Sequence, residues 1–144
     1  MAVDIRAPAL EAGADHALWM RLRYPLVRGE ETSSFVRTAT LADWTYSVPA
    51  IAREIRDPSL RVRDRSFATI NPDAALHLHR RPRGAWICLD SEVYCGPLGA
   101  GSASAQISDM DGPIGHTSQV ILIRPAAQQQ TIHASSQSRG EEKE

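Results

Sequence analysis

Three polar residues stand in otherwise apolar stretches of this 144-residue sequence, and their side chains could together hold one water molecule. Asp43 follows Leu-Ala in a segment that favours a helix, Thr69 lies in Phe-Ala-Thr-Ile, and Gln119 precedes a run of Val, Ile and Leu. A carboxylate can serve as general base while a hydroxyl and an amide position the water, which suits hydrolysis without a covalent nucleophile. The triple is not specific by itself, because many sheet proteins offer such residues.

Asp43 would be positioned by the segment 33–54, the only stretch with room for a long helix. Ser33 or Ser34 can cap its first turn, because a serine hydroxyl accepts a proton from an unpaired amide there. At 100° per residue the predicted buried face consists of Phe35, Ala39, Ala42 and Tyr46. Asp43 then lies on the flank of that face.

The surroundings of Asp43 leave two interpretations open. Aspartate is a poor helix former in mid-helix, which favours a functional position. The alternative is a surface aspartate that bonds to a nearby arginine. Pro49 removes an amide donor, so the helix should end or kink near Ser47, with 50–56 continuing as a second short turn.

The rest of the sequence predicts strands and turns. The expected strands are 19–27, 66–80 with an interruption at Pro72, 86–95, 102–110 and 115–124. Asp111-Gly112 falls where a hairpin turn should join the last two strands. One long helix followed by antiparallel strands predicts an α+β domain whose sheet curls around a central helix.

Composition limits the function classes. The net charge is −1 and charged residues make up 23%, so neither nucleic acid nor an anionic membrane is favoured as a partner. No apolar run approaches the roughly 20 residues that span a bilayer. We expect residues 1–17 to be a leader or linker remnant without signal-peptide character, 18–125 to form the domain, and 126–144 to be a disordered polar tail.

Cysteine and histidine usage predicts neither a disulfide nor a metal. Cys88 and Cys95 lie seven apart in one predicted strand, about 23 Å along it, which is too far for a bridge, so each is expected to be a small buried residue. Free thiols favour the cytoplasm. His77 and His79 share a strand face, but no further ligands accompany them at zinc spacing. No cofactor is expected.

The sequence resembles the C-terminal half of the double-hotdog enzymes of the acyl-CoA thioesterase II (thioesterase-like) superfamily. The matching text, from Trp19 to Pro125, comprises WMRLRYPLV, the helix with LAD, ATINPDAALHLHRRP, W-x-x-L-D-S, DGPIGHTSQ and the closing R-P. The stretch I-N-P-D-x-x-x-H-L-H-R is the most specific part.

This resemblance implies a single hotdog fold and assigns roles to the three polar residues. Asp43 would be the general base, while Thr69 and Gln119 would hold the attacking water. Asn71, Ser66 and Trp44 are predicted to support the site and contact substrate. The substrate would be an acyl thioester on CoA or a related carrier.

The sequence departs from that family in length, because the relatives carry two hotdogs and this chain holds only the second. A lone hotdog leaves a sheet edge uncovered, so we expect a homodimer. Two other functions stay open. One is a hotdog enzyme redirected to hydrolysis or rearrangement of a polyketide-like biosynthetic intermediate, and the other is a non-catalytic acyl-binding or structural subunit.

Overall fold

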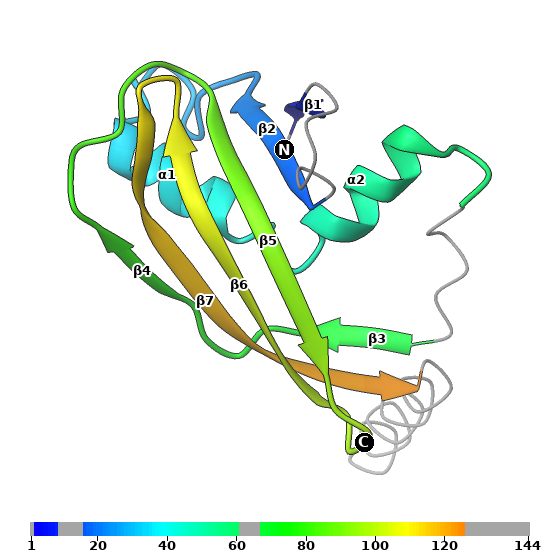
Figure 1. Cartoon of the computed structure of the whole chain (residues 1–144). Helices are drawn as coiled ribbons and strands as arrows, with labels where there is room; N and C mark the ends of the chain where they lie inside the picture. The colour runs from blue at the N-terminus through cyan, green and yellow to red at the C-terminus, as the bar shows by residue number, and fades with distance from the viewer. Residues whose placement is uncertain (1, 9–15, 61–66, 126–144) are drawn as a thin grey trace, which may run out of the picture.

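The computed structural model describes residues 2–8, 16–60 and 67–125, which form an antiparallel sheet with two helices (Figure 1). The strands run in the order β1-β2-β5-β6-β7-β3, and β4 also pairs with β7. The elements are β1 (Val3–Arg6), β2 (Ala17–Leu22), α1 (Ser34–Ala42), α2 (Val48–Arg56), β3 (Phe67–Ile70), β4 (Ala75–Leu78), β5 (Ile87–Cys95), β6 (Ala100–Asp109) and β7 (Gly112–Pro125). The expected α+β class with a curled antiparallel sheet is confirmed.

The three longest strands, β5, β6 and β7, form two successive hairpins at the centre of the sheet. The β6–β7 turn consists of Met110 and Asp111, and Gly112 follows with φ of 110°, a conformation that strains any other residue. The predicted hairpin at Asp111-Gly112 is therefore confirmed. The expected interruption at Pro72 is also present, because β3 and β4 are separate strands that pair with two parts of β7.

The helical segment is not one continuous helix, and it breaks close to Ser47, where the sequence predicts an end or kink. It forms two nine-residue helices, α1 and α2, which the turn 43–47 separates. Pro49 lies in the first turn of α2, where a missing amide proton costs nothing. The proline therefore begins the second helix, and α1 has already ended at Ala42. Ser33 caps α1 as expected, since its hydroxyl accepts from the Val36 amide at 3.3 Å.

The buried face of the helical segment is also different from the predicted one. Phe35 is 47% exposed and Ala39 is exposed, whereas Ala42 is buried as expected. The buried positions are Thr38, Leu41, Ala42 and Thr45. The prediction failed because it treated threonine as outward-facing. Both threonine hydroxyls donate to backbone carbonyls, Thr38 to Ser34 at 2.8 Å and Thr45 to Ala42 at 2.6 Å, so burying them leaves no hydroxyl donor unpaired.

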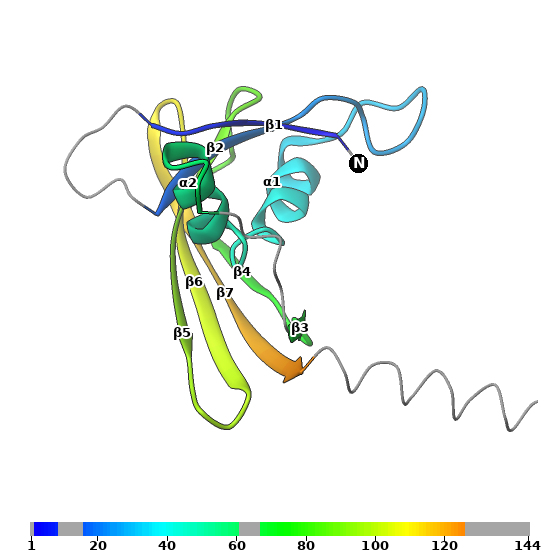
Figure 2. The same ribbon diagram turned by 90° about the vertical axis from the view of Figure 1, so that its right-hand side faces the viewer.

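The core lies between the helices and one face of the sheet, and Figure 2 shows both helices on that side. Its fully buried side chains come from α1, α2 and the strands β2, β5, β6 and β7: Leu18, Met20, Leu41, Val48, Ile87, Leu89, Ile107 and Ile114. Neither helix in the described part of the chain is long and apolar enough to cross a membrane.

The N-terminal segment expected to be a leader or linker remnant contains strand β1. It pairs along β2, and Asp4 accepts from Arg21 at 2.6 Å and from Arg23 at 2.7 Å. The pKa of Asp4 is lowered by its bonds to Arg21 and Arg23. The rest of that segment, residues 9–15, and the expected polar tail at 126–144 lie outside the described residues.

The two cysteines have different surroundings. Cys88 is buried, and burial together with the nearby Asp90 charge raises the pKa of its thiol to about 12. Cys95 is exposed near the end of β5, so the expectation of a buried side chain was wrong there. The strand leaves the helix-covered part of the sheet before it reaches Cys95, and its last two residues are both exposed.

A buried ion pair ties the β4–β5 loop to the β6–β7 hairpin. Asp109 is 2% exposed and accepts two bonds from the Arg80 guanidinium, each at 2.7 Å. It also accepts from the backbone amides of Arg83 and Asp111, each at 2.9 Å. The Arg80 guanidinium and these amides hold the pKa of Asp109 well below its usual range despite burial.

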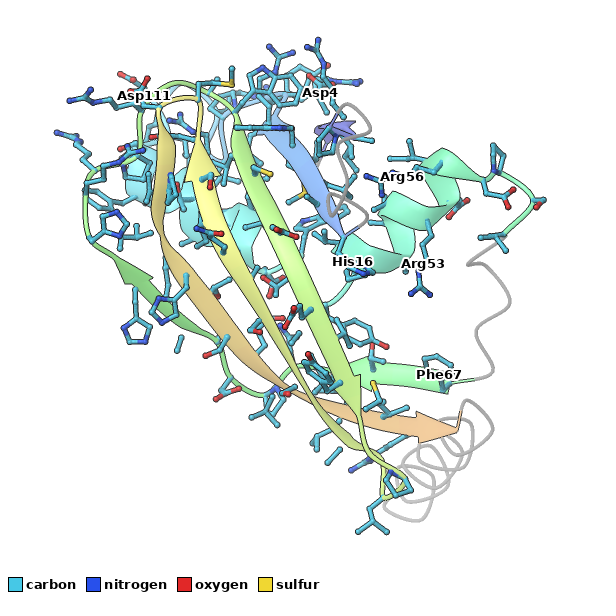
Figure 3. All side chains as sticks on the ribbon, in the orientation of Figure 1. Asp4, His16, Arg53, Arg56, Phe67 and Asp111 are labelled. Carbon is cyan, nitrogen blue, oxygen red and sulfur yellow. The ribbon has the colours of Figure 1, made fainter. Side chains whose placement is uncertain are left out.

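Replacing this carboxylate should destabilise the domain. We expect Asp109→Ala to lower the free energy of unfolding by about 2–3 kcal/mol, because two amides lose their acceptor and Arg80 loses its counterion. Arg80 then keeps only its bonds to the Gly112 and Pro113 carbonyls. Urea denaturation at pH 7 measures the loss. The control is Asp111→Ala in the adjoining turn, whose side chain is 56% exposed and lies 3.4 Å from Arg83 (Figure 3), with an expected change under about 0.5 kcal/mol.

The same ion pair predicts a pH dependence. Since folding lowers the pKa of Asp109, its stabilisation is complete above the ordinary aspartate pKa of about 4 and is lost as the pH falls further. The wild-type protein should therefore lose more stability between pH 5 and 2 than the Asp109→Ala variant, by roughly the difference measured at pH 7. Equal acid sensitivity of the two proteins would contradict this assignment.

Candidate active site

Asp43 lies where α1 ends and its carboxylate is exposed. The carbonyl dipoles at a helix C-terminus disfavour an anion by about 0.3–1 kcal/mol, so helix stability does not explain an aspartate here. Asp57 occupies the corresponding position of α2, but its carboxylate has a local role. It accepts from the Ser59 hydroxyl at 2.6 Å and the Ser59 amide at 3.0 Å, which lowers its pKa. Asp43 makes no comparable bond to its own loop among the described residues.

The side-chain partner of Asp43 is distant in sequence. Its Oδ1 accepts from the Asn71 side-chain amide at 2.9 Å. Asn71 follows β3 directly, in the break between β3 and β4. Two residues on, Asp73 accepts from the backbone amide of Val120 at 2.7 Å, which fastens the break to β7. The conspicuous Asn-Pro-Asp sequence thus serves twice: Asn71 orients the carboxylate and Asp73 holds the loop.

Gln119 reaches the same end of α1 from the sheet. It is 2% exposed, and its Nε2 donates to the Ala42 carbonyl at 3.2 Å, one residue before Asp43. Its Oε1 is buried and has no hydrogen-bond partner among the described residues. A buried unpaired oxygen costs about 1–3 kcal/mol, so it calls for an explanation beyond packing. A water molecule or a substrate group that donates to Oε1 would supply one.

The remaining predicted site residues are Thr69, Trp44 and Ser66. Thr69 pairs with Ile123 in the β3–β7 ladder and is half-buried, and neither hydrogen bond of the site involves it. It lies two residues before Asn71, on the face of the sheet that carries Gln119. Trp44 packs partly buried against the core. Ser66 lies outside the described residues.

The structure therefore brings together Asp43, Asn71 and Gln119. The alternative in which Asp43 bonds to an arginine is not what the described residues show, since its bond is to a neutral amide. The free oxygen of the Asp43 carboxylate can accept a proton, and the site offers a second acceptor at Gln119 Oε1, so the pair is suited to orienting a water molecule.

Asp73 is the residue that sequence reasoning missed. The signal was present in Asn-Pro-Asp, because a proline interrupts strand pairing and aspartate is a common acceptor for backbone amides in such breaks.

The paired histidines form no metal centre in the part of the chain that the structure describes. The ring of His77 stacks on His116 of the neighbouring strand, with the ring centres 4.8 Å apart. No group of three or more metal-ligating side chains occurs within residues 2–8, 16–60 and 67–125.

Residues 2–123 match the family described as acyl-CoA thioesterase C-terminal domain. The chain belongs to that family. No curated protein matches it. Among solved structures, a tesB protein of Mycobacterium avium subspecies paratuberculosis superposes with a TM-score of 0.58 at 17% identity, over 85% of this chain and 47% of that one. The acyl-CoA thioesterase II TesB2 of Mycobacterium marinum gives 0.56 at 19% identity, over 85% and 49%.

A thioesterase family protein of Silicibacter pomeroyi has a more similar length. It superposes with a TM-score of 0.51 at 14% identity, and 85% of each chain is covered. This chain spans about half the length of the two mycobacterial proteins. At these identities the similarity establishes the fold, and with the family it confirms the resemblance to acyl-CoA thioesterase II proteins.

The geometry of Gln119 predicts that its amide contributes little to stability. In Gln119→Met the bond to Ala42 is lost, but that carbonyl still accepts from the Thr45 hydroxyl and amide, and the unpaired Oε1 disappears. We expect the free energy of unfolding to change by less than about 1 kcal/mol. Ile121→Ala, two residues along β7 and 1% exposed, is the reference for a packing loss and should cost about 2–4 kcal/mol. A Gln119→Met loss as large as that of Ile121→Ala would show that the amide is structural.

Proposed function

We propose that this protein hydrolyses an acyl thioester carried by CoA or a related carrier, with Asp43 as general base. The observation that carries the proposal is the pairing of Asp43 with Asn71 beside the unsatisfied buried oxygen of Gln119. Membership in the acyl-CoA thioesterase C-terminal domain family supports the substrate class.

In the proposed reaction Asp43 and Gln119 Oε1 accept the two protons of one water molecule and so aim its oxygen at the thioester carbonyl. Asp43 takes a proton as that oxygen bonds to the carbonyl carbon. The C–S bond then breaks, the carboxylic acid forms and the thiolate leaves, and the proton on Asp43 passes to the thiolate or to solvent. Thr69, on the same sheet face, is the third proposed water ligand, and Asn71 keeps the carboxylate in place.

The site is open on one side, and we propose that a second copy of the chain covers it. Asp43 is exposed and Asn71 adjoins β3, whose outer edge has no strand partner in the described chain. Phe67 and Ile70 on this strand are 40% and 46% exposed. An unpaired strand with exposed apolar residues favours pairing with another chain. The double-length relatives support the same idea, since this chain matches only about half of them.

Thiol release from acyl-CoA substrates of increasing chain length tests the function. Asp43→Asn should lower kcat by about 10²–10⁴-fold, the usual contribution of a general base, because the amide cannot take the proton. The matched control is Asp57→Asn, the aspartate at the end of α2, which should keep the wild-type kcat. Wild-type turnover by Asp43→Asn, with Asp57→Asn equally active, would reject the mechanism.

The proposed dimer is tested by sedimentation velocity. Ile70→Lys should shift the protein toward monomer and lower thiol release, because a charge would be placed on the pairing edge. Met110→Lys is the control, since Met110 is 71% exposed in the β6–β7 turn, far from β3 in Figure 1. A monomeric wild-type protein with full activity would remove the dimer from the proposal. Activity only after addition of a separate hotdog chain would favour the subunit role.

A further inference from the structure

A second polar site lies on the helix-covered face of the sheet, between α2 and β5. It is a cavity of about 400 Å³. Its lining residues come from the residue before β2, from α2 and from β5: His16, Pro49, Arg53, Ser91, Glu92, Val93 and Tyr94. Figure 3 shows both His16 and Arg53 on the lower side of α2 as drawn. None of these residues belongs to the Asp43 site.

Two buried polar atoms in this cavity have no partner among the described residues. They are Nδ1 of His16 and Oγ of Ser91, and Ser91 is fully buried. The two residues are cross-strand neighbours, because the Ser91 amide donates to the His16 carbonyl at 3.0 Å and the ladder continues with Ala17 opposite Asp90. Side chains at such positions lie about 5 Å apart on the same face. One ligand group can therefore reach both.

Ser34 Oγ, in the first turn of α1, is also buried without a partner among the described residues, but the hydroxyls of the other fully buried residues are satisfied internally. Those of Thr38, Thr45 and Thr117 donate to backbone carbonyls at 2.6–2.9 Å. Ser91 and Thr117 lie in one row of inward-facing residues across the sheet. Ser91 on β5 pairs with Ala105 on β6, and Ala105 pairs with Thr117 on β7. A serine here without a carbonyl partner is thus a departure from the local pattern, and it occurs where the cavity provides space.

The charge in the cavity favours an anion. The Arg53 guanidinium has no ion pair within the described residues, and Arg53 lines the cavity together with Ser91 and His16. Glu92 is the one acidic residue in the lining. It faces the opposite side of the sheet from Ser91 and Val93, and its carboxylate accepts from the Tyr94 hydroxyl at 3.2 Å. Pro49 and Val93 form an apolar part of the cavity wall.

The cavity is within reach of the proposed hydrolysis site. Val93 pairs with Ala103, and Ala103 pairs with Gln119, so the three form one row across the helix-covered face. Since neighbouring strands are about 4.8 Å apart, Val93 lies roughly 10 Å from Gln119. An extended chain advances about 3.6 Å for every three bonds, so about eight bonds bridge that distance.

We propose that this cavity binds a carboxylate at the far end of the acyl group, so that the preferred substrates are medium-length acyl thioesters with an acidic terminus. Arg53 pairs with the carboxylate, and the Ser91 hydroxyl and His16 Nδ1 donate to it. This inference rests on the proposed placement of the thioester at Asp43. A phosphate of the carrier has similar anionic oxygens and is the other source of such a ligand.

Equilibrium binding to the Asp43→Asn protein tests the proposal without requiring turnover. The ligands are octanoyl-CoA and the CoA monothioester of octanedioic acid, which match in length and differ in the terminal carboxylate. We expect the carboxylate ligand to bind at least about 10-fold more tightly, as a charge-assisted bond should provide. Placing Arg53→Met or Ser91→Ala in the same background should reduce this ratio to within about 2-fold. Arg28→Met, an equal charge change on an exposed loop, should keep it.

The N-acetylcysteamine thioesters of the same two acids identify the source of the anion, because they carry no phosphate. A carboxylate preference that persists in this pair and depends on Arg53 supports the proposal. Equal binding of the two acyl groups overturns it. So does an Arg53→Met effect seen only with CoA ligands, which would assign the cavity to the carrier.

Failure of the hydrolysis proposal can be distinguished from failure of the cavity proposal. A carboxylate preference in binding, together with no thiol release from either substrate by the wild-type protein, would leave the cavity assigned and reject hydrolysis. Thiol release from both CoA substrates with no preference in binding would support hydrolysis and reject the carboxylate site in the cavity.

Discussion

The end of α1 meets the sheet at one buried amide, and this contact bears on the geometry of the site rather than on the stability of the fold. Gln119 on β7 donates to the carbonyl of Ala42, which also accepts from the hydroxyl and amide of Thr45 as the chain leaves the helix. This carbonyl is therefore fully satisfied although the helix stops there. Because the helix stops at Ala42, Asp43 is exposed at its end, within reach of the loop between β3 and β4.

That loop exists because β7 is longer than either of its partners on this edge. β4 pairs with residues 115–118 and β3 with residues 122–125, and the gap between them is spanned by a segment that contains a proline. Asp73 takes the amide of Val120 that a continuous strand would have taken. The missing ladder bond is thereby replaced, and Asn71 is free to point at Asp43. The site is thus a consequence of an interrupted strand whose backbone groups are nevertheless satisfied.

Buried polar groups on the helix-covered face divide into two kinds. The buried threonines bond to nearby carbonyls and act as core residues. Gln119 Oε1, Ser91 Oγ and His16 Nδ1 have no partner in the described chain, and they lie at the site beside Asp43 or around the cavity between α2 and β5. Unsatisfied buried oxygens and nitrogens are costly, so those at these two places favour ligand binding there. Ser34 Oγ and Arg37 Nε, in the first turn of α1, are also buried without a partner in the described chain, but they line neither of these two places.

The sequence by itself determined the class of the fold and the succession of strands from β2 onward, because alternation, the Asp-Gly turn and the proline interruption are local signals. It did not indicate β1, which lies in the segment expected to be a leader or linker remnant. It also singled out Asp43, Gln119 and Asn71, partly through a short motif. Only the tertiary structure decided which helix face is buried, since threonine is a polar residue type. Thr38 and Thr45 can be buried because their hydroxyls donate to backbone carbonyls within the helix or the turn that follows it. It likewise decided that Asn71 and Asp43 meet and that Ser91 and His16 face one cavity. Those contacts join residues 28 and about 75 positions apart, and no periodicity within one element reports such distances.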